Sequence, residues 1–80
     1  DAETRLKHVL MSLARVDGQW EEDEVLISTK ITHQDLAEIA GTSRETISRI
    51  ISKLQAQKML RIRAHKFVLV GHDRWKNVQP

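Results

Sequence analysis

The sequence of 80 residues predicts one small domain of the α+β class. Three observations lead to this prediction. Apolar residues recur at helical spacing near the N-terminus, a glycine separates two further segments of helical spacing, and two stretches are rich in β-branched residues. With 40% hydrophobic and 30% charged residues, the composition is typical of a soluble globular domain.

The composition also excludes several classes of protein. No apolar run approaches the roughly 18 residues of a membrane span, and no signal peptide is recognisable, so we expect a cytoplasmic location. The absence of cysteine excludes disulfides, thiol chemistry and cysteine-ligated metal centres. The first residue is not methionine, which predicts a fragment of a longer protein or a processed chain.

The first predicted element is an amphipathic helix over residues 3–16, which ends at Asp17 and Gly18. Its apolar face consists of Leu6, Val9, Leu10, Leu13 and Ala14. An acidic loop over residues 19–24 follows, and we expect Trp20 to fold back onto the core. The β-branched side chains of residues 25–31 predict a short strand.

Two helices around a glycine follow this strand. Thr32 is the expected N-cap of the first, with Asp35 as its capping-box partner, and Gly41 ends that helix. Its predicted inner face is formed by Leu36, Ile39 and Ala40, and Ala37 is small where the two helices approach each other. Ser43 is the expected N-cap of the second helix, over residues 44–57. Its apolar stripe consists of Ile47, Ile50, Ile51 and Leu54.

The last part of the chain predicts a β-hairpin with strands near residues 60–63 and 67–70. The turn over residues 64–66 lacks the glycine or asparagine that tight hairpin turns prefer. Asp73 is the expected cap of a final helical turn that carries Trp75. Two helices joined by a short glycine-containing turn form a helix-turn-helix, and a hairpin after it gives the winged variety.

The sequence therefore predicts a winged helix-turn-helix, with a three-helix core and a β-hairpin wing, as one domain over residues 1–80. The helix-turn-helix covers about residues 32–57, and the wing about residues 60–70. Charge is distributed unevenly, because residues 44–66 contain seven basic residues and one acidic residue. Such a basic segment favours a polyanionic partner such as nucleic acid, although a solvated lysine and arginine surface is the alternative.

The stretch "TSRETISRI", residues 42–50, concentrates hydrogen-bonding side chains on the second helix of the pair. The expected base-reading residues are Arg44, Glu45, Ser48 and Arg49, which share the outward face of this helix. In a helix-turn-helix this face enters the major groove, where such side chains match base edges. The alternative is an exposed face on which Glu45 and Arg49 form an i,i+4 ion pair.

Phosphate contacts have their own candidates at helix N-termini and along the wing. Free backbone N–H groups and the positive end of the helix dipole attract anions, and basic side chains do the same. The candidates are Thr32, Gln34, Thr42, Ser43, Thr46, Lys53, Arg63, His65 and Lys66.

The stretch "ITHQDLAEIAGTSRETISRIISKL", residues 31–54, resembles the DNA-binding domain of the cyclic-AMP receptor/fumarate–nitrate regulator (CRP/FNR) family. The resemblance implies that Arg44, Glu45 and Arg49 read bases, and that Ser48 does so as in the fumarate–nitrate branch. It also implies a bacterial transcription regulator that binds double-stranded DNA as a homodimer, on a two-fold symmetric operator with TGA-like half-sites. The family's sensor domain, which binds the effector, and its dimerisation helix lie upstream of the matched region. We expect no cofactor in this chain. The family's frequent wing glycine is missing here.

Other functions fit the sequence less well. A winged helix used only for protein–protein contact is the main alternative, and it predicts an exposed apolar patch with residues 44, 45 and 49 covered. The acidic stretch over residues 21–24 is most simply a solvated loop, with a neighbouring domain or RNA polymerase as the alternative partner. We expect no enzymatic activity, because no nucleophile–base pair or phosphate-binding loop is present. The four histidines lack metal-ligand spacing and are expected to be solvated or locally bonded: His8, His33, His65 and His72.

Overall fold

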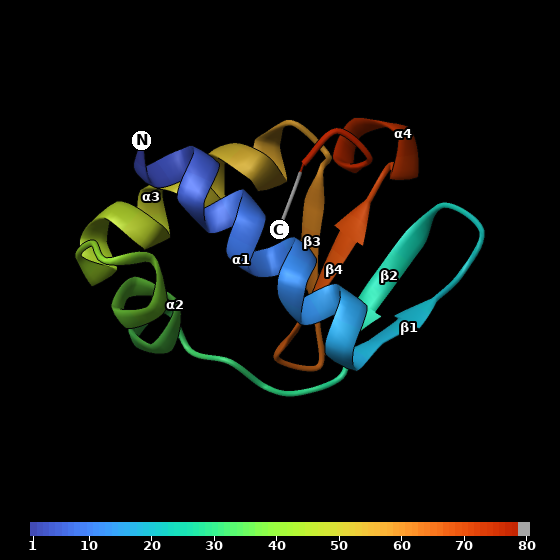
Figure 1. Ribbon diagram of the computed structural model, residues 1–80, viewed down its shortest axis with the longest axis horizontal. Coiled ribbons are helices and arrows are strands. Elements are labelled where there is room, and N and C mark those ends of the chain that lie inside the picture. Colours follow the sequence, from blue (N-terminus) through green and yellow to red (C-terminus); the bar gives the residue numbers. More distant parts are fainter. Residues whose placement is uncertain (79–80) are drawn as a thin grey trace.

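The computed structural model describes residues 1–78, in which four helices pack together with an antiparallel sheet (Figure 1). In chain order the elements are α1 (Ala2–Asp17), β1 (Gly18–Trp20), β2 (Glu24–Ile27), α2 (His33–Ala40), α3 (Arg44–Ala56), β3 (Leu60–Arg63), β4 (Lys66–Val70) and α4 (His72–Trp75). This arrangement confirms the α+β class, the helix-turn-helix and the wing. No helix of residues 1–78 is both long and apolar enough to cross a membrane.

The sheet has the strand order β1-β2-β4-β3, and each pair of neighbours is antiparallel. Strand β1 was not expected, since Gly18 was assigned to the end of the first helix and residues 19–20 to the acidic loop. Three residues are too few to show an alternating pattern, and β1 exists because it pairs with β2, with Gln19 opposite Leu26. The strand expected over residues 25–31 ends at Ile27, where the backbone N–H of Ser28 donates to Asp17 O at 2.8 Å.

One hydrophobic core lies between the helices and the sheet. The side chains of α1 and α3 that the helical patterns predicted as apolar faces supply much of it, although Val9 and Leu13 are only half-buried. Two expectations about the core were wrong. Ile39 is 60% exposed, and Ala37 takes its place on the buried face of α2. Trp20 is 49% exposed and meets His72 edge-on, with ring centroids 6.1 Å apart.

Gly18 joins α1 to the sheet at a point that leaves no space for a side chain. A Cβ at this position would lie 2.2 Å from Ala14 O and 2.6 Å from Val25 Cγ2. The backbone of Gly18 itself is extended, with φ of −98°. Glycine is therefore required here by the lack of space between the Ala14 carbonyl group and the Val25 side chain.

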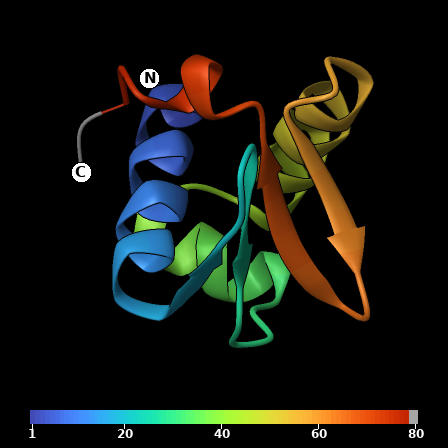
Figure 2. The same ribbon diagram turned by 90° about the vertical axis from the view of Figure 1, so that its right-hand side faces the viewer.

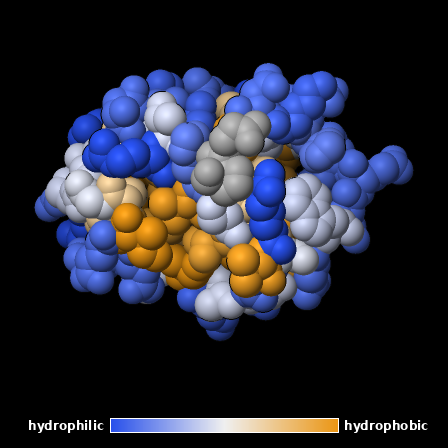
Figure 3. Space-filling view, in the orientation of Figure 1, coloured by the Kyte–Doolittle hydropathy of each residue, from blue (hydrophilic) through white to orange (hydrophobic). Residues whose placement is uncertain are grey.

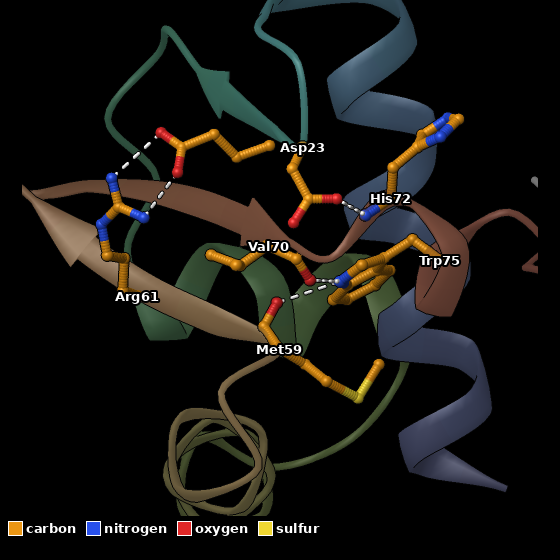
Figure 4. A network of polar contacts seen from close by, with 7 residues as sticks. Asp23, Met59, Arg61, Val70, His72 and Trp75 are labelled. Carbon is orange, nitrogen blue, oxygen red and sulfur yellow. Dashed lines mark hydrogen bonds and ion pairs between the residues drawn. The ribbon is translucent and has the colours of Figure 1, made fainter.

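Trp75, the last residue of α4, is buried and covers one end of the core (Figure 4). Its Nε1–H donates to Met59 O at 2.9 Å and to Val70 O at 3.1 Å, so the indole connects the start of the hairpin to its end. The expectation that Asp73 caps α4 was wrong, because Asp73 lies inside the helix and the N-cap is Gly71. A more distant carboxylate takes the role, since Asp23 Oδ1 accepts from the backbone N–H of His72 at 3.1 Å.

Candidate nucleic-acid interface

The turn between α2 and α3 is built as the sequence predicts. Thr32 Oγ1 accepts from the Asp35 N–H and the Asp35 carboxylate accepts from the Thr32 N–H, which is a complete capping box. Gly41 ends α2 in the left-handed conformation with φ of 71°. Ser43 Oγ then accepts from the Thr46 N–H at 3.1 Å and begins α3. These local bonds set where each helix starts and stops, and thus which side chains of α3 point outward.

Helix α3 has two faces of opposite character. All four residues of its predicted apolar stripe are buried. On the other side Arg44, Glu45 and Arg49 are exposed and are not covered by any part of residues 1–78. The i,i+4 ion pair between Glu45 and Arg49 is not among the ion pairs of that range. The polar face of α3 is therefore open and its side chains are free to meet a ligand.

Ser48 differs from the other three candidate base-reading residues. It is half-buried, and its Oγ lies 2.8 Å from Nδ1 of His33, the first residue of α2. The ring of His33 in turn stacks on Phe67 of the wing, with centroids 6.3 Å apart and planes 24° apart. This contact was not expected, because His33 was predicted to be solvated or locally bonded and Ser48 is 15 residues away. The position of His33 at the start of the first helix of a helix-turn-helix, facing the second, is the signal that could have found it.

The N-terminus of α3 gathers three hydroxyl side chains. Ser43 Oγ also donates to Thr46 Oγ1 at 2.9 Å, so these two candidates are ordered by each other. Ser43 is exposed, whereas Thr42 and Thr46 are half-buried. The first backbone N–H groups of a helix have no partner within the helix, and in α3 that of Thr46 is bonded to Ser43 Oγ. The arrangement suits a phosphate oxygen.

Two further phosphate candidates have protein partners. Gln34 Nε2 donates to Glu38 Oε2 at 3.2 Å, one turn along α2. The ammonium group of Lys53 lies 2.8 Å from Glu3 Oε1 of α1. The lysine side chain is 55% exposed and Glu3 is half-buried, and ion pairs at the surface contribute only about 0–1 kcal/mol, so a phosphate group can compete for the lysine.

The wing turn reaches the geometry of a tight hairpin without glycine. Ala64 and His65 both have positive φ, 51° and 64°. The turn contains only these two residues, one fewer than expected, because Lys66 already pairs with Arg63 in the ladder. Arg63 and His65 are exposed and Lys66 is half-buried.

A hollow lies between the wing and the segment that precedes α2. Its lining includes Lys30, Thr32, His33, Ile62 and His65. It thus brings together two predicted phosphate candidates, Thr32 and His65, that are far apart in sequence. Lys30 is a basic residue at this surface that sequence analysis missed, although its place two residues before the helix N-cap could have indicated it.

In Figure 2 the β3–β4 hairpin and α3 lie to the right and α1 lies to the left, and the Lys53 side chain of α3 reaches Glu3 of α1. Not every arginine nearby is available. The Arg61 guanidinium donates to both carboxylate oxygens of Glu24, at 2.7 Å and 3.0 Å (Figure 4). The hydrogen bond from Arg61 lowers the pKa of the Glu24 carboxyl group, and desolvation opposes this only in part. The Arg61 guanidinium is therefore bound to Glu24 of β2 and is not a candidate for a phosphate contact.

Comparison with known proteins agrees with this geometry. Residues 4–74 match the family model described as the Crp-like helix-turn-helix domain. The chain is 33% identical over 69 residues to the global nitrogen regulator of Nostoc sp., an alignment covering 86% of this chain and 31% of that protein. It is 33% identical over 72 residues to the cAMP-activated global transcriptional regulator CRP of Salmonella typhimurium, and this alignment covers 89% of this chain and 33% of that protein. The structure of a CRP/FNR-family transcriptional regulator of Thermus thermophilus superposes with a TM-score of 0.77 and 27% identity. The superposition covers 95% of this chain and 39% of that one.

The chain belongs to the Crp-like helix-turn-helix family, which confirms the family that the sequence resembles. A domain of this class is the DNA-binding output part of a transcription regulator. The chain spans about a third of the length of these curated relatives.

Proposed function

We propose that this domain reads double-stranded DNA by inserting α3 into the major groove, as the output domain of a bacterial transcription regulator. One observation carries the proposal: Arg44, Glu45 and Arg49 lie uncovered on the face of α3 opposite its buried stripe. Charged side chains in this arrangement contribute nothing to the core, but they match the chemistry of base edges.

The individual side chains suit different bases. Arginine donates two hydrogen bonds to O6 and N7 of guanine, glutamate accepts from the amino group of cytosine, and serine bonds to several bases. Each good contact of this kind contributes about 1–3 kcal/mol of discrimination against the wrong base. Arg44, Glu45 and Arg49, together with Ser48, are therefore the proposed determinants of sequence preference.

The phosphate contacts supply affinity and register. We assign them to the hydroxyls at the N-termini of α2 and α3, to Lys53, and to the wing. In residue terms they are Thr32, Gln34, Thr42, Ser43, Thr46, Lys53, Arg63, His65 and Lys66. Each lysine or arginine that neutralises a phosphate adds about −0.9 to the slope of log affinity against log salt concentration.

Selection of bound DNA sequences, followed by anisotropy titrations at several salt concentrations, tests the proposal. Arg49→Ala should abolish the preference at one base pair, whereas Lys53→Ala should weaken binding to all sequences alike and reduce the salt slope. Arg15→Ala is the matched control, because it removes the same charge from an exposed position on α1. If Arg49→Ala and Lys53→Ala have the same DNA affinity, base preference and salt slope as Arg15→Ala, the proposed function is wrong.

The parent regulator is proposed to act in the cytoplasm as a homodimer on a two-fold symmetric operator, with RNA polymerase as a further partner. A single module of this type buries only about 600–1,000 Å² on DNA, so one copy of the chain is expected to bind weakly. Covalent linkage of two copies should raise the affinity for a symmetric site far more than for a single half-site. Nanomolar binding by one copy to one half-site would contradict this.

A second role is favoured by an apolar groove away from α3. Val9, Leu13 and Val16 of α1 line it together with Ile39 of α2, and Val16 is 88% exposed. Figure 3 shows an apolar area on the face that carries α1. Large exposed apolar patches mark protein–protein contacts. We therefore retain a protein-interaction role beside DNA binding, and Val16→Ser with Ile39→Ser should weaken self-association without changing the DNA affinity of one copy.

A further inference from the structure

His33 occupies the junction of three elements of the proposed interface. It is the first residue of α2, its Nδ1 lies 2.8 Å from Ser48 Oγ on α3, and its ring stacks on Phe67 of β4. Phe67 is buried and Ser48 is half-buried, so both sides of the imidazole contact are held by the fold. The ring therefore lies against Ser48, the one candidate base-reading residue that has a side-chain partner within residues 1–78.

The direction of this hydrogen bond determines what Ser48 can offer to a ligand. A serine hydroxyl has one hydrogen to donate and two lone pairs that accept. When Nδ1 of His33 carries no proton, it accepts the Ser48 hydrogen, and the hydroxyl presents only lone pairs outward. When Nδ1 is protonated, it donates to Ser48 Oγ, and the serine hydrogen is free to point away from the protein.

We propose that His33 is a positioning residue for Ser48, and that protonation of its imidazole converts Ser48 from a hydrogen-bond acceptor into a donor at the base edge. This inference rests on the proposed function, because it requires Ser48 to read DNA. We assign the proton of the neutral ring to Nε2, so that Nδ1 accepts from Ser48, and Ser48 then accepts from the amino groups of adenine or cytosine. In the imidazolium state, Ser48 donates to guanine O6 or N7, or to thymine O4. The added proton comes from solvent and no covalent bond changes.

Other charged groups lie near the contact between His33 and Ser48. Lys30 and His65 line the hollow beside His33, from the segment before α2 and from the wing. Asp35 lies in the first turn of α2 and is bonded to the Thr32 N–H, and Arg44 precedes Ser48 by one turn of α3. Among these groups only the imidazoles of His33 and His65 belong to the residue type that changes charge between about pH 5 and pH 8. The contribution of His65 must therefore be separated from that of His33.

Selection of bound DNA sequences by the purified chain at about pH 5.5 and about pH 8 tests the inference, because this interval spans histidine titration. The wild type should change its preferred base at one position of the half-site, by about fivefold or more, towards guanine or thymine at the lower pH. Ser48→Ala should lose the preference at that position and no other. His33→Phe keeps a ring against Phe67 without the hydrogen bond, and His33→Asn keeps a hydrogen-bonding group that does not titrate, so both should abolish the pH-dependent change.

His65→Asn is the matched control, because asparagine tolerates the left-handed backbone of residue 65 and removes the second titrating ring. The change of base preference should persist in this variant. Loss of the change in His65→Asn, or its persistence in a folded His33→Phe or His33→Asn, would overturn the inference. It is also overturned if Ser48→Ala leaves every position unchanged. In that case Arg49→Ala tests DNA reading by α3 separately, because a loss of base preference in that variant would still support the proposed function.

Discussion

The ammonium group of Lys53 lies 2.8 Å from Glu3 Oε1, so the first turn of α1 holds a cation that belongs to α3. Glu3 also pairs with Lys7 at 3.2 Å. Removing the carboxylate frees Lys53 for phosphate. We expect Glu3→Gln to raise DNA affinity at low salt by at most about fivefold, since exposed ion pairs contribute no more than about 1 kcal/mol. Anisotropy titrations at fixed salt measure this effect.

The control for that prediction is Glu22→Gln, which removes the same charge from the exposed β1–β2 connection. It should change DNA affinity less than Glu3→Gln, because it frees no basic residue of α3. An equal gain in both variants would mean that net charge, and not the release of Lys53, sets the affinity.

The bidentate pair of Arg61 and Glu24 makes stability depend on pH. Arg61 lowers the pKa of the Glu24 carboxyl group below its ordinary value of 4.5, so the folded chain holds the ionised form more strongly than the unfolded chain. The resulting stabilisation is fully present above pH 4.5 and is lost as the pH falls through the lower folded pKa. Glu24→Gln should therefore have a lower Tm than the wild type at pH 7, and the difference should vanish in acid. Thermal melts followed by circular dichroism check this, and a difference that stays constant with pH would contradict it.

Gly41 is required by its backbone conformation alone. Its φ is 71°, and a Cβ at this position would meet no atom within 4 Å. Gly41→Ala should destabilise the domain by about 1–2 kcal/mol, because alanine is strained in the left-handed region. Gly41→Asn should cost less, since asparagine visits that region more readily. Chemical denaturation of both variants tests the order, and equal losses would mean that side-chain crowding, not backbone strain, is responsible.

The two tryptophans should respond differently to the same change. Trp75 is buried and its Nε1–H bonds to two carbonyl oxygens, whereas Trp20 is half-exposed and has an edge contact with His72. Trp75→Phe should lower the free energy of unfolding by about 1–3 kcal/mol, because it removes the hydrogen bonds of Nε1–H and leaves space where the larger buried ring was. Met59 O keeps a bond from the Val70 N–H, which limits the loss. Trp20→Phe should have almost no effect, and a larger loss in Trp20→Phe than in Trp75→Phe would be inconsistent with the fold.

The helix-turn-helix could be predicted because its determinants are local. The N-caps Thr32 and Ser43 and the terminating Gly41 lie within a few residues of the groups that they bond, and the structure confirms all three. The outward face of α3 followed from the isoleucine stripe in the same way. Propensity alone argued against the tight wing turn, but the pairing of β3 with β4 holds Ala64 and His65 in left-handed conformations.

The features that the sequence did not reveal depend on tertiary placement. Ile39 and Ala37 flank the same helical stripe, and which of them is buried depends on where α1 lies. Strand β1 exists only through its pairing with β2. The contact of His33 with Ser48 joins residues 15 apart, and it requires the particular angle at which α2 and α3 meet. None of these is encoded in a local pattern.

Strand β3 forms an outer edge of the sheet, since β4 is its one neighbour in the strand order. An edge strand can recruit a strand of another molecule, and charged side chains along it prevent such aggregation. Arg61 and Arg63 are the charged members of β3 and alternate with Leu60 and Ile62. The charge of Arg63 thus opposes strand pairing between molecules at β3, besides its proposed contact with DNA. A variant with an apolar residue at position 63 is expected to aggregate before its DNA affinity can be measured.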